Sequence, residues 1–250
     1  MRLIGLVALS LVLGAPAWGV AQEAAPAAKE PPPPPPRVEG SGEFAFVNSN
    51  GNADSTSLGI RGEVIYRPDP WLVKTRGAWV RLESDEELEA ESFVFLLRGE
   101  RKVKPRLSVY GQYDYLRDLF AGLFHKNVVS GGLSFKAVGS ERHELVLDGG
   151  LGWSSEQRTV GEDVSTAVLT AGLGYKLKVT ETTEFVEAVR YEQSLSRGDD
   201  WHLDNELSLA AKINTIFSLK VSNVIRYVNE PVGDFETTDM ITSAALVAKL

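Results

Sequence analysis

Apolar and polar residues alternate along most of the chain, and the segment 201–212 shows the pattern clearly. Its large apolar members stand at odd positions: Trp201, Leu203, Leu207 and Leu209. Polar members stand at even positions: His202, Asp204, Glu206 and Ser208. A period of two is the side-chain period of a β-strand that has one face in an apolar medium and the other in a polar one.

The repetition of this alternation from residue 40 onward predicts twelve strands. We expect them at residues 40–48, 55–67, 71–83, 90–103, 106–115, 126–137, 144–156, 164–179, 184–194, 201–213, 217–228 and 239–250. So many alternating segments with charges on the polar face indicate an all-β fold, a transmembrane antiparallel up-and-down β-barrel of about twelve strands. Ten strands are the alternative count.

The expected connections alternate in length along the chain. Short turns are expected at residues 68–70, 104–105, 139–140, 180–183 and 214–215. Longer connections are expected at residues 49–54, 84–89, 116–125, 157–163, 197–200 and 229–238. This arrangement is typical of outer-membrane barrels, whose short turns face the periplasm. An even strand count then places both termini in the periplasm.

The N-terminal region predicts export across the inner membrane. Arg2, an apolar stretch at residues 3–13 and small residues at 19–21 fit a signal peptide over residues 1–21. Residues 22–39 contain six consecutive prolines and predict a periplasmic linker, stiffened by polyproline II conformation. The barrel is expected over residues 40–250, in the outer membrane of a Gram-negative envelope.

Charged residues on the polar face of the strands are expected to face the lumen. A charge at the bilayer midplane costs about 2–4 kcal/mol on the lipid face of a barrel, which disfavours the opposite assignment. The expected lumen-facing charges, structural or pore-lining, are Arg61, Glu63, Arg98, Arg190, Glu192, Lys212, Lys220 and Arg226. The apolar face should contact lipid.

Aromatic residues fall largely near the ends of the expected strands. Outer-membrane barrels place such residues in girdles at the two membrane interfaces. The expected interfacial aromatics are Trp71, Trp79, Tyr115, Trp153, Tyr175, Trp201 and Tyr227.

Composition narrows the range of partners. The 250 residues carry a formal net charge of −8 and include no cysteine. The acidic balance does not favour a nucleic-acid-binding surface. Acidic residues gather in the expected outer loops, where they either hold divalent ions that bridge lipopolysaccharide or simply keep the loops soluble. Expected partners are outer-membrane lipid, lipopolysaccharide and, during biogenesis, the barrel-assembly machinery; the sequence leaves the oligomeric state open.

The three histidines, His125, His143 and His202, do not predict chemistry. None has a second histidine or a cysteine at ligand spacing, so no transition-metal site is expected. Outer-membrane phospholipases use serine, histidine and asparagine on the lipid-facing side, whereas His202 falls on the expected lumen face and His143 at a short turn. Their spacing gives no nucleophile–base pair. We expect no catalytic residue, no cofactor and no enzyme activity.

Several stretches resemble a known family. They are residues 42–56 with the Asn-Gly-Asn-Ala-Asp-Ser-Thr loop, 113–122, 131–133, 172–175 and 237–247. Together they resemble the YdiY-like family of uncharacterised bacterial outer-membrane proteins, often labelled salt-induced, over about residues 40–250. The resemblance implies a β-barrel in the outer membrane, and it implies neither a substrate nor catalytic residues.

The function predicted from the sequence is that of an outer-membrane β-barrel, porin-like, acting as a narrow channel or as an envelope-integrity protein linked to salt or osmotic conditions. Three alternatives stay open at this point. They are a cation-selective or small-solute channel, a lipid-modifying outer-membrane enzyme and a soluble periplasmic ligand-binding barrel.

Overall fold

Twelve strands make up the barrel unit of the protein. The computed structural model describes residues 36–50, 55–84 and 87–249, so the expected signal peptide and most of the expected linker lie outside the described residues. The strands are β1 (Val38–Asn50), β2 (Ser55–Tyr66), β3 (Trp71–Ser84), β4 (Glu87–Lys104), β5 (Leu107–Asp118), β6 (Leu123–Gly139), β7 (His143–Arg158), β8 (Val164–Lys178), β9 (Thr183–Ser194), β10 (Trp201–Lys212), β11 (Phe217–Val228) and β12 (Thr238–Lys249). A short 3-10 helix, η1 (Leu119–Ala121), lies between β5 and β6. Among the described residues, no helix is long and apolar enough to cross a membrane.

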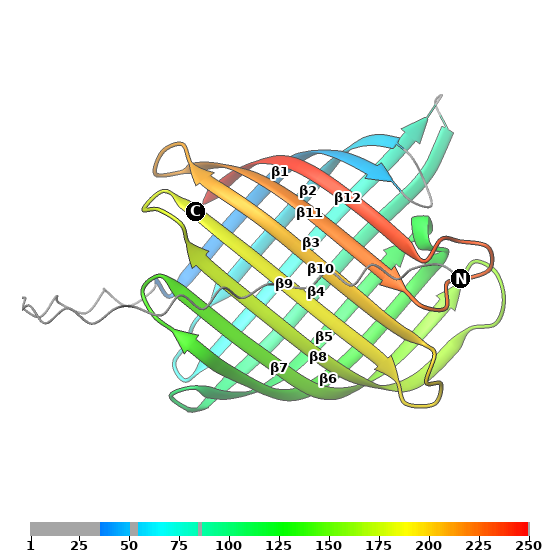
Figure 1. The fold of residues 1–250 in the computed structure, drawn as a ribbon, viewed down its shortest axis with the longest axis horizontal. Coiled ribbons are helices and arrows are strands. Elements are labelled where there is room, and N and C mark those ends of the chain that lie inside the picture. The colour runs from blue at the N-terminus through cyan, green and yellow to red at the C-terminus, as the bar shows by residue number, and fades with distance from the viewer. Residues whose placement is uncertain (1–35, 51–54, 85–86, 250) are drawn as a thin grey trace, which may run out of the picture. The chain divides into compact units, whose positions relative to one another are not determined.

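Each strand pairs antiparallel with its neighbours in the chain, and β1 pairs with β12 to close the barrel (Figure 1). At the closure Phe44 stands opposite Leu246 in register. Closure leaves no strand edge unpaired, which is the only way a sheet can satisfy its backbone in a bilayer. The predicted twelve-stranded up-and-down barrel is therefore confirmed.

Two expected connections are wrong. Residues 84–89 were expected to form a longer connection, but β3 runs to Ser84 and β4 begins at Glu87. Residues 116–125 were expected to form a long loop, but β5 continues to Asp118 and β6 begins at Leu123. The alternation in fact continues through Leu116 and Asp118, whose side chains line the lumen. At the other end of the chain, β1 begins at Val38, within the segment expected to be linker.

The two faces of the sheet have opposite character. Large apolar side chains such as Val129 and Leu151 point outward and are each 60% exposed. The inward residues include many buried polar groups, among them Ser130, Ser134 and Thr170. A water-soluble protein buries its apolar face, so this inverted arrangement fits a barrel surrounded by hydrocarbon.

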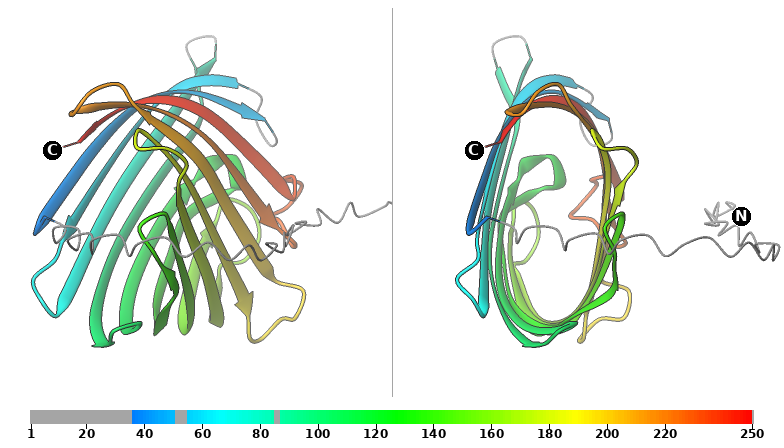
Figure 2. Two further views of the ribbon diagram at one scale, coloured as in Figure 1. Left: turned by 60° about the vertical axis from the view of Figure 1, so that its left-hand side comes forward. Right: turned by 90° about the vertical axis from the view of Figure 1, so that its left-hand side faces the viewer.

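The barrel is flattened in cross-section, with β3–β5 and β8–β10 forming its long walls (Figure 2). The sheet bends sharply where β6 meets β7, and the inward positions there are glycines. A Cβ added at Gly150 would lie 2.6 Å from both the Gly131 carbonyl oxygen and the Tyr110 hydroxyl. A Cβ at Gly152 would lie 2.6 Å from the Val129 carbonyl oxygen. The bend therefore requires these glycines, and it brings opposite walls within reach of each other.

Candidate functional site

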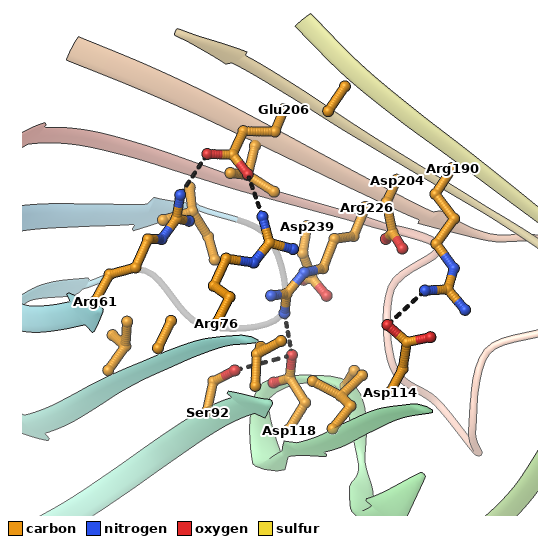
Figure 3. A pocket seen from close by; sticks show the side chains of 18 of the residues that line it. Arg61, Arg76, Ser92, Asp114, Asp118, Arg190, Asp204, Glu206, Arg226 and Asp239 are labelled. Atoms are coloured by element: carbon orange, nitrogen blue, oxygen red, sulfur yellow. Dashed lines mark hydrogen bonds and ion pairs between the residues drawn. The ribbon is translucent and has the colours of Figure 1, made fainter. Parts of the chain in front are cut away.

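The lumen encloses a cavity of about 310 Å³ (Figure 3). Its basic lining residues are Arg61, Arg76, Lys126, Arg190 and Arg226. Its acidic lining residues are Glu43, Asp114, Asp118, Glu192, Asp204, Glu206 and Asp239. Small apolar side chains of the inner face fill the space between these charges.

Glu206 on β10 is the centre of one group of charges, the Glu206 cluster, which consists of Glu206, Arg61, Arg76, Lys220 and Glu43. The Arg61 guanidinium of β2 donates to Glu206 at 2.5 Å, and Arg76 of β3 approaches the same carboxylate at 3.8 Å. Lys220 of β11 lies 3.6 Å from Glu206 and 3.1 Å from Glu43. Because β1, β12 and β11 separate β2 from β10, the contacts of Arg61 and Arg76 with Glu206 reach across part of the lumen and narrow the passage (Figure 3).

Two further ion pairs cross the lumen from β5, and we call them the crossing pairs. Arg190 of β9 donates to Asp114 at 2.7 Å. Arg226 of β11 pairs with Asp118, whose side chain is 1% exposed and also accepts a hydrogen bond from Ser92. Buried charges persist only when paired, so these contacts hold the long walls of the barrel together.

Lys126 of β6 is the centre of a buried group of charges, nearer the end of the barrel that carries the loop between β11 and β12. Its ammonium lies 3.0 Å from Glu156 and 2.9 Å from Glu192, and the three side chains are each less than 10% exposed. Arg158 pairs with the second oxygen of Glu156, and His202 lies 3.3 Å from the Lys126 ammonium. This group fills the wall of the lumen beneath the loops.

Arg98 of β4 lies in a separate group on the curved side of the barrel. It contacts Glu100 at 2.6 Å and Asp148 of β7 at 3.0 Å. It also donates to Gln112 at 3.0 Å, and its guanidinium lies 4.0 Å from the centre of the Tyr110 ring. The side chain of Arg98 thus links β4 to β5 and to β7 through its contacts with Gln112 and Asp148.

The loop between β11 and β12, residues 229–237, covers one mouth of the barrel. Its Val232 is 6% exposed, and its Phe235 ring lies so close to Gly122 that a Cβ there would be 2.6 Å from the ring. Gly122 adopts a φ of 70° and follows η1 on the opposite wall. Viewed along the barrel, both the loop and η1 lie inside its outline (Figure 2). The β11–β12 loop thus forms a lid that rests on η1.

The connection before β10 supports this lid. Asn229 donates a side-chain hydrogen bond to the Asp199 carbonyl at 2.8 Å, and Arg197 lies 3.5 Å from Glu230. Arg197 also pairs with Asp200 at 2.5 Å. The hydrogen bond from His202, followed by the contact with Arg197, lowers the pKa of Asp200 to about 2. The carboxylate of Asp200 is therefore ionised at all but strongly acidic pH.

Seven of the eight lumen charges expected from the sequence lie on the inner face with ionic partners. These are Arg61, Glu63, Arg98, Arg190, Glu192, Lys220 and Arg226. Lys212 differs, because it ends β10 at the mouth opposite the lid and is exposed. No ion pair of Lys212 occurs among the described residues.

The expected interfacial aromatics lie on the outer face, close to the strand ends. Trp201 lies between Tyr191 and Tyr227, with ring centres 5.9 and 4.8 Å away, at the lid end. Trp71 and Trp153 are 50% and 56% exposed. The other three contact polar or aromatic neighbours: Trp79 bonds to Glu91, Tyr115 to His125 and Tyr175 to His143.

Sequence reasoning missed several residues that meet in the lumen. Glu206 and Asp204 share the inward parity of β10, so the same alternation could have identified them. Asp118 was placed in a loop, and Glu156 at the end of a strand beside the expected loop at residues 157–163. Within the part of the chain that the structure describes, no group of three histidine or acidic side chains is arranged to hold a metal ion.

Several solved outer-membrane structures are similar to this chain. The NanC porin is 9% identical with a TM-score of 0.57, and the match covers 83% of this chain and 98% of the porin. An outer-membrane channel from Pseudomonas putida F1 is 9% identical with a TM-score of 0.54, over 91% of this chain and 100% of that one. The translocator domain of the autotransporter NalP from Neisseria meningitidis is 10% identical with a TM-score of 0.50, over 86% and 89%. At these identities the similarity shows a shared fold alone.

A search among curated proteins found no match. Residues 42–250 match a family model described as "Protein of unknown function, DUF481".

Proposed function

The chain belongs to the DUF481 family, whose function is unknown, and we propose that it is a narrow outer-membrane channel for small solutes with a preference for cations. One observation carries this proposal: a lumen with a charged cavity of about 310 Å³ lies inside a closed barrel whose outer face is apolar. A lumen with fixed charges gives an ion or polar solute a favourable path across hydrocarbon.

The outer face supports a membrane location. Outward side chains such as Phe44, Ile60 and Leu133 are each more than half exposed, and surface of this kind would drive a soluble barrel to aggregate. By the usual arrangement of such barrels the lid end faces the exterior, and both termini face the periplasm. The outer loops then meet lipopolysaccharide, and assembly requires the barrel-assembly machinery.

The sign of the lumen charge supports the cation preference. The cavity is lined by seven carboxylates and five lysine or arginine side chains. Asp204 is exposed to the cavity, and its charge acts on Arg190, which forms its ion pair with Asp114. An excess of negative charge in a narrow passage concentrates cations and repels anions.

In this proposal, the described conformation corresponds to a closed channel. The lid rests on η1 at one mouth, and the Glu206 cluster and the crossing pairs span the lumen below it. The same crossing contacts favour a second candidate, a structural barrel that maintains the envelope without conducting. A link to salt or osmotic conditions, which the resemblance to YdiY-like proteins implies, fits either role.

A catalytic role is not part of the proposal. The outward-facing His125 and His143 contact the hydroxyls of Tyr115 and Tyr175. His202 lies in the lumen with Lys126 and Asp200 as neighbours. Among the described residues no serine hydroxyl bonds to the imidazole ring of these histidines, and Ser140 contacts only the backbone of His143. A lipid-modifying enzyme would require a serine–imidazole pair at the lipid interface.

Cell fractionation followed by bilayer recording tests the proposal. We expect the protein in the outer membrane, with a gel mobility that changes on boiling, and small cation-preferring conductance steps in planar bilayers. A folded barrel with no conductance, even after removal of the lid, would support the structural role instead. Recovery in the soluble periplasmic fraction would overturn both.

A further inference from the structure

The outer face of the barrel is not uniform around its perimeter. Along the middle of β6–β8 the outward residues are glycine, alanine or large apolar residues: Val129, Gly131, Leu133, Leu147, Gly149, Leu151, Leu169, Ala171 and Leu173. The outward polar residues Asn127, Ser155 and Ser165 of these strands stand in register with one another beyond Trp153, toward the lid end. On β9–β12 four polar residues occupy comparable outward positions: Glu187, Asn205, Asn223 and Thr242. We call these four residues the polar stripe.

The members of the polar stripe are neighbours on the surface. Asn223 stands directly opposite Thr242 and donates a hydrogen bond to its hydroxyl at 2.9 Å. Leu207 stands opposite both Glu187 and Asn223, and Asn205 lies two residues before it on the same face. Diagonal neighbours of this kind are about 7–8 Å apart, within reach of amide and carboxylate side chains. The stripe is therefore one continuous surface.

The stripe reaches the middle of the apolar band. Asn205 lies four residues along β10 from Trp201, and Asn223 lies four residues along β11 from Tyr227, the aromatics at the lid end. At about 3.4 Å per residue and a strand tilt of about 35–45°, both asparagines lie roughly 10 Å below those rings. An apolar band about 25 Å tall places them near its centre.

Hydrocarbon offers no hydrogen-bonding partner to the two amides, so they are costly there. Glu187 stands in register with Tyr175, nearer the other membrane interface. Asn205 illustrates the cost, because its side-chain oxygen is buried with no hydrogen-bond partner in the described structure. Polar groups at this depth are expected where another protein covers them. The apolar middle of β6–β8 has no such requirement.

We propose that the outer face of β9–β12 is the contact between two copies of this chain within the membrane, an inference that rests on the proposed membrane location. The polar stripe contains acceptors in Glu187 and donors in the amides of Asn205 and Asn223. A two-fold axis brings the same surface against itself, so a set with both donors and acceptors is self-complementary. Ala244, beside Thr242 on β12, lets the two backbones approach closely, as small residues do in membrane interfaces.

Energy transfer between labelled copies tests this contact. The chain has no cysteine, so Glu162→Cys in the exposed β7–β8 loop provides a single labelling site for donor and acceptor dyes. The full-length protein is reconstituted in phospholipid vesicles over a range of protein-to-lipid ratios. We compare it with the double variant Asn205→Leu/Asn223→Leu and with Asn127→Leu, an outward asparagine on the opposite wall.

The labelled protein with an unchanged polar stripe should show energy transfer that rises with the protein-to-lipid ratio. The transfer should level off at the value expected for a dimer. The double variant should fold and show the boiling-dependent mobility shift, but associate at least tenfold more weakly, because hydrogen bonds in membranes are worth about 0.6 kcal/mol each and both copies lose them. Asn127→Leu should associate normally. A folded protein without transfer, or equal effects of both variants, would overturn the proposal. Failure to insert into vesicles would instead refute the membrane location.

Discussion

Replacing Glu206 with glutamine removes the charge that holds three basic side chains across the lumen. Arg61, Arg76 and Lys220 converge on this carboxylate at 2.5, 3.8 and 3.6 Å. In Glu206→Gln the three cations keep only Glu43 as a nearby acid within the Glu206 cluster. Their mutual repulsion should widen the passage and destabilise the folded barrel.

The expected magnitude lies between two limits. A solvent-exposed ion pair contributes about 0.2–1 kcal/mol, whereas breaking a fully buried pair costs about 3–5 kcal/mol. Side chains of the Glu206 cluster are between 12% and 29% exposed, so water partly screens them. We therefore expect Glu206→Gln to lower the free energy of unfolding by about 2 kcal/mol, roughly a thirtyfold change in the unfolding equilibrium.

Urea unfolding in lipid vesicles, followed by tryptophan fluorescence and by the boiling-dependent mobility shift, measures this loss. Glu63→Gln is the control, because Glu63 forms its ion pair with Lys74 at 2.8 Å and reaches the Glu206 cluster only through the effect of its charge on Arg61. It should cost less than 1 kcal/mol. Bilayer recordings should also show a larger conductance and a shift toward anions in Glu206→Gln.

Equal stability and equal conductance of Glu206→Gln and Glu63→Gln would refute this reasoning. If Glu206→Gln were as stable and as poorly conducting as Glu63→Gln, the crossing contacts would not close the lumen. A double-mutant cycle with Arg61→Gln isolates the closest pair, and we expect a coupling of about 1 kcal/mol.

Four further predictions address the outer face, the lid, the bend and the lid support. Leu133→Arg places a charge on the lipid face of β6, midway along the strand, at a cost of about 2–4 kcal/mol, and should abolish the boiling-dependent mobility shift of an assembled barrel. Phe235→Ala removes the ring that seats the lid on η1, and single-channel recordings should show longer openings; unchanged openings would mean that the lid is not a gate. Gly150→Val forces a side chain into backbone and should lower the urea midpoint strongly, whereas Gly149→Val, which meets open space, should not. Asp200 has a folded pKa of about 2 against an ordinary 3.8, so its stabilising contribution is complete above about pH 4 and is lost as the pH falls toward 2. The protection of residues 195–200 against hydrogen exchange, relative to the intrinsic exchange rate at each pH, should fall over that range, and Asp200→Asn should remove this pH dependence.

The strand pattern could be predicted from the sequence because hydrocarbon outside the barrel and the polar lumen inside it require alternating apolar and polar residues along every strand. The segment 217–228 was expected as a strand and is β11 with the same bounds. Its Leu219 and Val221 are each 51% exposed on the outer face. A period of two fixes both the strand and its register, because a slip of one residue would place every charge in lipid. The expected and observed strands differ mainly at their loop ends, where both faces meet water.

The partners of the lumen charges could not be predicted in the same way. Alternation assigns Arg226 to the inner face, but it does not say that Asp118, more than a hundred residues earlier, lies across from it. That pairing depends on how far the barrel is flattened, a property of all twelve strands together. Phe235 and Gly122 illustrate the same limit, since a lid contact between two loops leaves no periodic signal in either.

Flattening and ion pairing depend on each other in this barrel. The inward glycines at the β6–β7 bend let the sheet turn sharply, and the turn brings β5 within reach of β9 and β11. The crossing pairs then hold the walls at that separation, because relaxing toward a round section would leave Asp118 buried without its guanidinium. The width of the passage is thus set jointly by a backbone requirement at Gly150 and by side-chain charges on the opposite wall. A solute that competes for those charges would release the walls, so binding and opening are expected to be coupled in the lumen.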